Sequence, residues 1–267
     1  MRVCKECGIE FKRNRREQVF CGRRCANIDR ARRREKARES LRQYSVWSCG
    51  AGVQSTAIAV LIIQGKLPKP DFAIMTDCGY EPSYILDHVH NRLVPELSKV
   101  GVRLHVVNAS EYVDTGLFSA TGLLAIPAYA EIDGKVAQYR TYCSSRFKIQ
   151  PAMRWIKEQG VERCVNWLGV SIDETRRGRV SRRKWIEYRY PLIELGMDRD
   201  ACAWLIGQHG WPRPERSSCV MCGQRPEVEW ERMRRLYPSD YEWARQIERD
   251  IQEREPGVYL RRTLESL

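Results

Sequence analysis

The segment SCGAGVQST, residues 48–56, combines small residues with hydroxyl and amide side chains, a composition suited to holding a phosphate group. It follows a β-prone run and precedes an apolar run that is expected to be helical. A glycine-rich turn between a strand and a helix lets backbone N–H groups converge on an anion, and the positive end of the helix points to the same place. The segment has neither the G-K-[ST] ending of a Walker loop nor the G-x-G-x-x-G order of a dinucleotide site. A tight turn without a ligand is the alternative interpretation.

Four cysteines near the N-terminus have the spacing of a zinc site. They are Cys4, Cys7, Cys21 and Cys25, in the pattern C-x2-C-x13-C-x3-C. Two close pairs of thiolates can surround a tetrahedral Zn²⁺, and a segment this short and polar needs such an ion to fold. We therefore expect a zinc finger over residues 1–27, with free thiols on a disordered tail as the alternative.

The positive charge of the chain is concentrated at the same end. The formal net charge is +12, and residues 1–43 contain 15 Lys and Arg against 6 Asp and Glu. Residues 28–43 are predicted to form a basic helical linker, so the N-terminal segment has the character of an arm that binds DNA or RNA. A helix that only improves solubility is the alternative. No apolar run is long enough to cross a bilayer, and the N-terminus does not resemble a signal sequence, so we expect a cytoplasmic protein without a membrane partner.

From residue 44 onward, short β-branched runs alternate with helical patterns. Strands are expected near residues 44–48, 71–77, 102–109 and 164–171, and helices near residues 54–65, 82–99 and 145–159. This alternation predicts an α/β fold with a mainly parallel, doubly wound sheet over residues 44–226, followed by a helical extension at 227–267. Ligands bind beyond the carboxyl ends of the strands in such sheets, so residues 48–56 and Asp77 are expected at one edge.

Several segments resemble the motifs of one enzyme family. Ser48, Gly50, Gly52 and Ser55 match the S-G-G-x-x-S pattern of the PP-loop, with Cys49 and Ala51 as departures. Later matches follow in the expected order: TDCGYEP, YCSSRFKIQP, LGVSIDETRRGR, YPLIEL and SSCVMC. Together they resemble the phosphoadenylylsulfate (PAPS) reductase-like proteins of the PP-loop ATP pyrophosphatase superfamily. The segment GAGVQST is similar to the corresponding segment of stand-alone members of this family found in phage genomes.

The resemblance implies an adenine nucleotide site with assigned residues. Its pyrophosphate loop would consist of Ser48, Gly50, Gly52, Gln54, Ser55 and Thr56. Asp77 would lie near the nucleoside or a Mg²⁺ ion, or would serve only as a turn residue, and Arg146 and Lys148 would neutralise phosphate charge. Catalytic roles would fall to Asp173, Glu174, Arg177 and Cys143. The two carboxylates are suited to holding Mg²⁺ and the neighbouring arginines to gripping the phosphates of ATP, whereas a solvated loop would have the same composition.

A second cysteine group departs from the family pattern. Adenylylsulfate reductases bind a four-iron cluster through a Cys-Cys pair and a late C-x-x-C, but here Tyr142 precedes the single Cys143. Cys143, Cys219 and Cys222 would still suffice for a [4Fe-4S] cluster with one open iron, as in some tRNA thiolation enzymes of the superfamily. A second zinc completed by His209 or Cys202, or reduced structural thiols, are the alternatives. Cys49, Cys78, Cys164 and Cys202 are expected to be small core residues.

The resemblance favours an enzyme that adenylates a substrate and releases pyrophosphate, for nucleic-acid modification such as thiolation, with a sulfur donor protein as a further partner. One alternative is a nucleic-acid-binding module whose nucleotide domain is not catalytic. Another is sulfonucleotide reduction. The sequence ends in YLRRTLESL without the E-C-G motif that supplies the catalytic thiol of PAPS reductases, so this alternative would require a thiol from a partner.

Overall fold

The computed structural model describes residues 1–15 and 17–267, which form two compact units, Met1–Gln43 and Tyr44–Leu267. In the first unit, strand β1 (Arg2–Val3) pairs antiparallel with β2 (Glu10–Phe11). Helix α1 (Arg23–Glu39) follows and buries only Cys25. Because the rest of its surface is polar, α1 is not a core element. Arg32 forms an ion pair with Glu6, with 2.8 Å between the charged atoms, which ties the helix to the cysteine-bearing loops.

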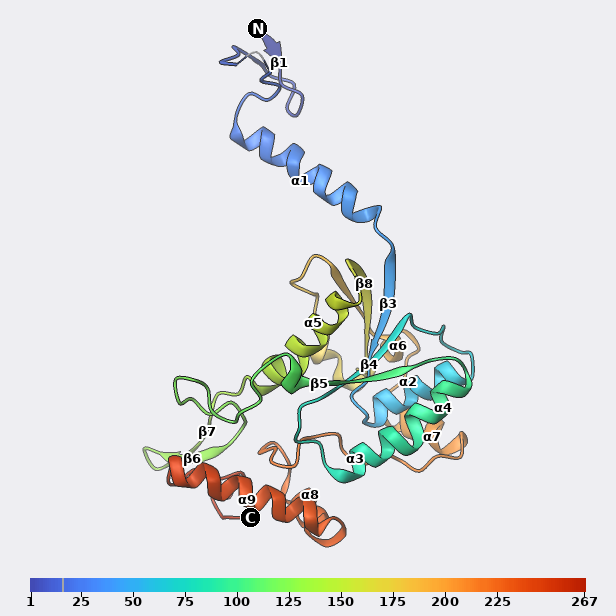
Figure 1. The fold of residues 1–267 in the computed structure, drawn as a ribbon, viewed down its shortest axis with the longest axis vertical. Helices are drawn as coiled ribbons and strands as arrows, with labels where there is room; N and C mark the ends of the chain where they lie inside the picture. The colour runs from blue at the N-terminus through green and yellow to red at the C-terminus, as the bar shows by residue number, and fades with distance from the viewer. Residues whose placement is uncertain (16) are drawn as a thin grey trace. The chain divides into compact units, whose positions relative to one another are not determined.

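The second unit is built on a five-stranded sheet with the order β5-β4-β3-β8-β9 (Figure 1). The pairs β3–β4, β4–β5 and β8–β9 are parallel. The strands are β3 (Gln43–Ser48), β4 (Phe72–Asp77), β5 (Leu104–Asn108), β8 (Arg163–Leu168) and β9 (Ile186–Arg189). This topology confirms the predicted α/β fold, although β9 was not anticipated.

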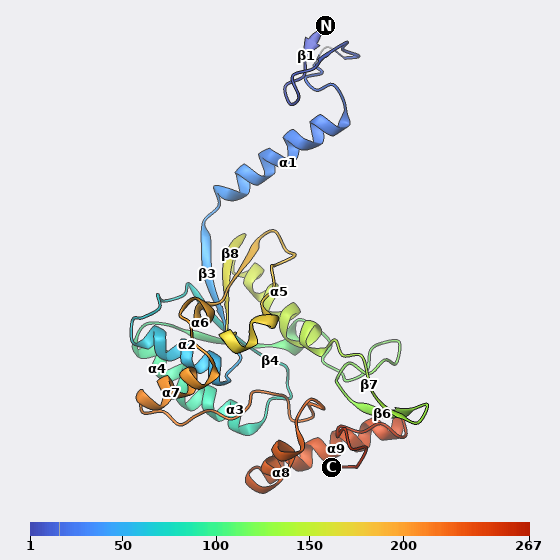
Figure 2. The ribbon, with the colours of Figure 1, turned by 180° about the vertical axis from the view of Figure 1, so that it is seen from behind.

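Helices cover both faces of this sheet. Helix α2 (Val53–Ile63) packs on one face with α4 (Val94–Lys99) and α7 (Arg199–Gln208), around a core that includes Trp47. Helix α5 (Gln150–Glu158) packs on the other face, in a core that includes Val46. Adjacent residues of β3 thus point to opposite faces, as the pleat of a strand requires. Figure 2 shows α2, α4 and α7 on one side of the strands and α5 on the other.

Two helical segments contain π-helical turns next to a proline. The predicted helix at residues 82–99 consists of α3 (Ser83–His88), the π-turn η1 (Val89–Leu93) and α4, which has Pro95 in its first turn. The π-turn η3 (Ser144–Ile149) likewise precedes α5, which has Pro151 in its first turn. Proline lacks the N–H for an internal helical bond, and its ring crowds the preceding turn, so the chain widens before it. η3 matters for the site because it carries Lys148.

Further elements complete the α/β unit, and a third core surrounds its C-terminal helices. These elements are η2 (Ala109–Glu111), β6 (Tyr129–Ile132), β7 (Lys135–Gln138), η4 (Ile172–Arg177), α6 (Pro191–Glu194), α8 (Glu227–Leu236) and α9 (Pro238–Arg254). β6 and β7 pair antiparallel and were not anticipated. Trp230 and Ile251 from the two helices lie in one apolar cluster with Phe147 of η3. The predicted helical C-terminal region is therefore present, and it packs against the segment that follows Cys143. Across residues 1–15 and 17–267, no helix is long and apolar enough to span a membrane.

Asp240 of α9 fixes the start of α3. Its carboxylate is buried and accepts hydrogen bonds from the Ser83 backbone N–H at 3.1 Å and from the Ser83 hydroxyl at 2.8 Å. Replacing Asp240 by alanine would leave these donors without their charged acceptor, and we expect the free energy of unfolding to fall by about 2–3 kcal/mol. Urea unfolding followed by circular dichroism measures this loss. Asp87→Ala, at an exposed position on α3, is the control, and an equal loss in both variants would contradict the assignment.

Candidate active site

The loop between β3 and α2 leaves a row of backbone amides without acceptors. Helix α2 begins after Gly52, and no side chain caps the first amides of the helix. The Cys49 N–H donates to Ile74 O at 2.7 Å, and the Gly50 N–H donates to Ser55 Oγ at 2.9 Å. Within the described part of the chain, no acceptor receives the amides of residues 52–55, whereas the Ala51 N–H donates to the Cys49 sulfur. The first amides of a helix carry its positive end, so this turn is suited to binding an anion.

The backbone of this loop is strained at one position. Ala51 has a φ angle of 55°, in the left-handed region that residues with a Cβ rarely adopt. Such a conformation costs on the order of 1–3 kcal/mol and persists only where the surrounding structure enforces it. Ala51 is completely buried, so its neighbours supply that constraint. Strain of this kind is characteristic of ligand-holding turns and agrees with the predicted role of residues 48–56.

Two glycines allow other segments to approach the loop closely. A Cβ atom on Gly52 would lie 2.7 Å from the Ser217 hydroxyl oxygen, and one on Gly169 would lie 3.2 Å from the Ser55 nitrogen. Ser217 precedes the late cysteine pair, and Gly169 follows β8. The Ser48 hydroxyl donates to Asn166 on β8 at 2.9 Å. The loop is therefore held by segments that lie more than a hundred residues away along the chain.

The loop lines one end of a cleft of about 470 Å³. Polar residues of the cleft are Ser48, Ser55, Thr76, Glu81, Ser144, Lys148, Asn166, Arg177 and Arg179. Apolar and aromatic residues are Ile74, Met75, Ile149, Ala152, Met153, Leu168, Val170, Tyr188 and Tyr190. The cleft thus offers cations and free amides together with an apolar wall. A nucleotide has the matching combination of charged phosphates and a flat, mostly apolar base.

The segment after β8 closes over the cleft through a short network. The Gln54 side chain donates to the Glu174 carboxylate at 3.1 Å, and Glu174 forms an ion pair with Arg177 at 2.7 Å. The Tyr190 hydroxyl accepts from the Arg179 N–H at 2.7 Å and donates to the Arg179 carbonyl at 2.8 Å. Arg177 and Arg179 both line the cleft. These bonds connect Arg177, through Glu174, to helix α2 and connect Arg179 to Tyr190, directly after β9.

Not all predicted site residues line this cleft. The Asp77 carboxylate accepts from the Gly79 N–H at 2.8 Å, the arrangement of a turn residue. Asp173 accepts from the Arg199 N–H at 3.2 Å, and its pKa is lowered, first by a hydrogen bond from Ser171. Arg146 forms an ion pair with Asp114 at 2.6 Å. Among the cofactor residues predicted on η3, only Lys148 lines the cleft.

A polar group adjoining the cleft was not predicted as a unit. The Lys148 ammonium lies 2.7 Å from Oε1 of Glu81, a carboxylate that is 3% exposed. The same oxygen lies 3.5 Å from Cys78 Sγ, which lies 3.4 Å from Cys219 Sγ. Cys78 is buried, as expected, but it contacts these polar groups in addition to apolar residues.

The charges of this group shift the pKa values of its members. The pKa of Cys219 is lowered, first by the hydrogen bond from Cys78 and then by the positive charge of Lys148. The same hydrogen bond, followed by burial, raises the pKa of Cys78. Burial is the largest single influence on Lys148 and lowers its pKa, but the negative charges of Glu81, Cys219 and Cys78 together outweigh burial and raise the pKa. Cys219 is therefore the thiol that ionises first, and Lys148 keeps its charge.

Cys143 and Cys222 lie outside this compact group. In the described residues, the thiols of Cys143, Cys219 and Cys222 do not come together within 4.8 Å of one another, so they do not form a preformed site for a single ion. The charges of Cys219 and Cys143 nevertheless contribute, after burial, to raising the pKa of Cys222, so the three are neighbours. A four-iron cluster attaches each thiolate to a separate iron and needs a wider spacing than one ion does. The three-cysteine cluster stays a prediction.

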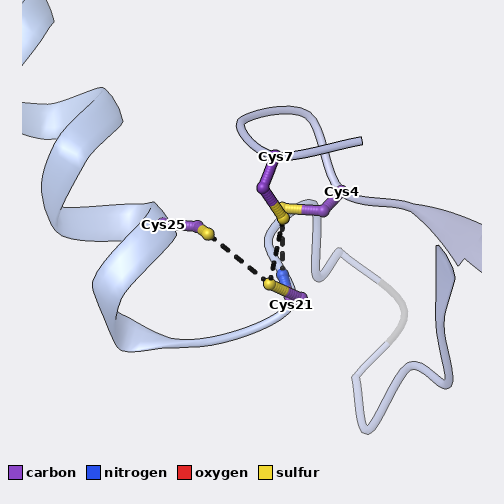
Figure 3. A group of neighbouring side chains, drawn as sticks. All are labelled: Cys4, Cys7, Cys21 and Cys25. Atoms are coloured by element: carbon purple, nitrogen blue, oxygen red, sulfur yellow. Dashed lines mark hydrogen bonds between the residues drawn. The ribbon is translucent and has the colours of Figure 1, made fainter. Parts of the chain in front are cut away.

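The N-terminal cysteines do form the expected group. Figure 3 shows Cys4, Cys7, Cys21 and Cys25 directed toward one another, with Cys25 on the first turn of α1. The Cys7 and Cys21 sulfurs are 3.6 Å apart, and those of Cys21 and Cys25 are 3.5 Å apart. Four thiolates at this spacing fit a tetrahedral Zn²⁺.

The structure adds site residues that the sequence analysis did not single out. Glu81 stands within the segment TDCGYEP, and the resemblance of that segment to a family motif was the available signal. Asn166 is a lone polar residue inside the apolar run CVNWLGV, which was a weaker signal. The contact between Cys78 and Cys219 joins positions 141 residues apart, so no local pattern indicates it.

Comparisons with known proteins give only distant similarities. No family model and no curated protein sequence matches the chain. The phosphate complex of PAPS reductase from Candida auris is a similar structure, with 17% identity, a TM-score of 0.42, and coverage of 68% of this chain and 79% of its own. The U34-tRNA thiolase NcsA from Methanococcus maripaludis, solved with its [4Fe-4S] cluster, has 17% identity, a TM-score of 0.44, and coverage of 94% and 89%. At this identity and these TM-scores, the likenesses identify no activity or ligand of this chain.

The His88 side chain contacts Thr56 of helix α2 and makes the stability of the fold depend on pH. Its Nε2 lies 2.9 Å from Thr56 Oγ1, and burial, followed by the charge of Arg92, lowers its pKa to about 4. Because the unfolded histidine titrates near 6.5, the unfolded state binds more protons between about pH 4 and 6.5, and stability should fall as the pH drops through this window.

We expect His88→Gln to flatten this part of the pH profile, because glutamine can contact Thr56 but does not titrate. Denaturant unfolding at four pH values between 7 and 4 measures the slope. His90→Gln, at an exposed position, should retain the wild-type slope. Identical slopes in all three proteins would show that His88 is not the responsible group.

Proposed function

We propose that the protein is a PP-loop-type enzyme that adenylates a substrate with ATP and releases pyrophosphate. The observation that carries this proposal is the turn between β3 and α2, which presents the unpaired amides of residues 52–55 beside a cleft that has both cations and an apolar wall. A diphosphate on these amides would place the base of the nucleotide along the apolar wall. The α-phosphorus would then face the middle of the cleft.

The proposed reaction has two steps. In the first, a carbonyl or amide oxygen of the acceptor forms a bond to the α-phosphorus, and the bond from that phosphorus to the β-phosphate oxygen breaks. Pyrophosphate leaves into the loop, where amides and arginines stabilise its charge. In the second step, a sulfur or amine nucleophile attacks the activated carbon and releases AMP. Gly52 and Gly169 support this arrangement because they let the segments that carry Ser217 and Gly169 pack closely against the loop.

Mg²⁺ would accompany the ATP phosphates in this reaction. The ion commonly binds through substrate phosphates, waters and one or two carboxylates. Glu174 is our candidate carboxylate because Gln54 connects it to the loop helix. Asp173, predicted for the same role, already accepts from the first amide of α7. We therefore assign Asp173 to positioning the η4 segment.

A nucleic acid is the proposed acceptor. Residues 1–43 form a separate unit with 15 basic and 6 acidic residues and a group of four cysteines suited to zinc. In the second unit, a cavity of about 330 Å³ is lined by five arginines and two glutamates: Arg199, Arg213, Arg216, Arg225, Arg232, Glu215 and Glu229. One wall of this cavity is the segment that continues to Ser217, the residue beside Gly52. Phosphodiesters are the natural ligands of such basic surfaces.

Arg177 is the first residue to test. We expect Arg177→Ala to lower kcat/KM for pyrophosphate release by about 10²-fold, because it removes a cation from the phosphate end of the cleft. Arg182→Ala is the matched control: it lies on the same exposed segment but does not line the cleft. A coupled pyrophosphate assay with ATP and total RNA or DNA as acceptor gives the readout. Release of ADP and phosphate in place of pyrophosphate would contradict the proposed reaction.

The second test removes residues 1–43, which form their own compact unit. We expect the shortened protein to bind nucleic acid at least tenfold more weakly and with a smaller dependence on salt, because fewer counterions are released. Fluorescence anisotropy at several salt concentrations measures both effects. ATP binding, followed by calorimetry, should be unchanged. If nucleic-acid affinity is unchanged as well, the N-terminal unit does not bind the acceptor.

A further inference from the structure

A second group of metal-binding side chains lies in the α/β unit. Cys78, Glu81 and Cys219 each present a ligand atom, and these three atoms lie within 4.8 Å of one another. Cys78 and Glu81 are buried, with 1% and 3% of their surface exposed, and Cys219 is half-buried. None of the sequence motifs indicated this combination, because the segments that carry Cys78 and Cys219 meet only in the fold.

The spacing of the three atoms matches a single tetrahedral ion. Zinc bonds of about 2.3 Å to sulfur and 2.1 Å to oxygen place two sulfur ligands about 3.8 Å apart and a sulfur and an oxygen about 3.6 Å apart. The Cys78 and Cys219 sulfurs are 3.4 Å apart, and Cys78 Sγ lies 3.5 Å from Glu81 Oε1. The N-terminal cysteines provide a reference within the same molecule, with sulfur separations of 3.5 and 3.6 Å. The separations from Cys78 to its two neighbours are therefore close to those among the N-terminal cysteines.

The charges also balance around a divalent cation. Two thiolates and one carboxylate carry three negative charges, and the Lys148 ammonium, 2.7 Å from Glu81, carries one positive charge. An ion of charge +2 brings the whole group to neutrality, which a buried cluster of charges requires. Lys148 would then act as the hydrogen-bond donor that orients the ligating carboxylate, a common feature around metal sites.

We propose that Cys78, Glu81 and Cys219 bind a thiophilic divalent cation of the zinc class, with the fourth coordination position directed to the nucleotide cleft. Three protein ligands and one open position are typical of catalytic zinc sites, whereas structural sites have four protein ligands. Glu81 and Lys148 line the cleft, so the open position is accessible to water or to a substrate atom. The proposal does not rest on the adenylation reaction.

This site competes with the predicted cluster for one ligand. Cys219 cannot serve both a single ion with Cys78 and Glu81 and a four-iron cluster with Cys143 and Cys222. Only Cys78, Glu81 and Cys219 have the short spacing that a single ion needs, whereas Cys143 and Cys222 lie outside this group in the described residues. The metal content of the protein separates the two possibilities.

The test is a metal count on the full-length protein, purified under anaerobic conditions and reconstituted with Zn²⁺ alone. We expect about two zinc ions per chain, one at the N-terminal cysteines and one here. Cys78→Ala and Cys219→Ala should each retain one. Cys164→Ala is the matched control, because Cys164 is buried on β8 and belongs to neither group, and it should retain two. Circular dichroism confirms that each variant is folded.

Two further measurements keep the result independent of a folding defect. Glu81→Gln keeps an acceptor for Lys148 but removes a negative ligand, and we expect the second zinc to bind at least tenfold more weakly in a chelator competition. Co²⁺ substitution should give sulfur-to-cobalt absorption that decreases in Cys78→Ala and not in Cys164→Ala. One zinc per chain in the folded wild-type protein would overturn the proposal. So would about four irons per chain, or a disulfide between Cys78 and Cys219.

Discussion

The turn from β3 into α2 is the constraint around which the α/β unit is arranged. A chain that passes directly from a buried strand to a buried helix exposes the first amides of the helix, and burial elsewhere would make these unpaired groups costly. Here Gly52 and Gly169 let neighbouring segments pack closely against the turn, while Ala51 accepts a left-handed conformation. An anion satisfies donors that the protein itself leaves without acceptors. The strain at Ala51 and the free amides thus have a common explanation.

A second electrostatic constraint lies where β4 ends. The buried carboxylate of Glu81 is compensated by the partly exposed ammonium of Lys148, and without this partner its charge would lose its hydration without compensation. Their contact fixes η3 against the start of α3, and Asp240 holds that start from the other side. The pair therefore determines where Cys78 and Cys219 meet. It also brings a fixed positive charge to the wall of the cleft, where an anion would be attracted.

The sequence predicted those features that depend on local patterns. The alternation of β-branched runs with amphipathic runs was sufficient for the α/β class, and the composition of residues 48–56 was sufficient to locate the strand-to-helix turn. Strand β9 was missed because its four residues include two charged ones, Glu187 and Arg189, and give no apolar run. The partners of Cys219 were missed for a different reason. Local spacing favoured Cys222, whereas the fold brings Cys78 close from another strand, and such long-range contacts leave no periodicity in the sequence.

The distribution of charge separates two tasks that make different demands on arginine and lysine. The proposed capture of a nucleic acid requires cations in excess, and residues 1–43 have 15 basic against 6 acidic residues. A phosphate cleft instead benefits from cations that are held in place before the ligand arrives, and Arg177 and Lys148 each have a carboxylate partner. Those partners lower the attraction of the empty cleft for nucleic-acid backbones, because each cation is already compensated. A nucleotide that brings Mg²⁺ with its phosphates compensates the carboxylates as well. The cleft would therefore favour a metal-bound nucleotide over a bare polyanion, although both ligands present the same phosphate groups.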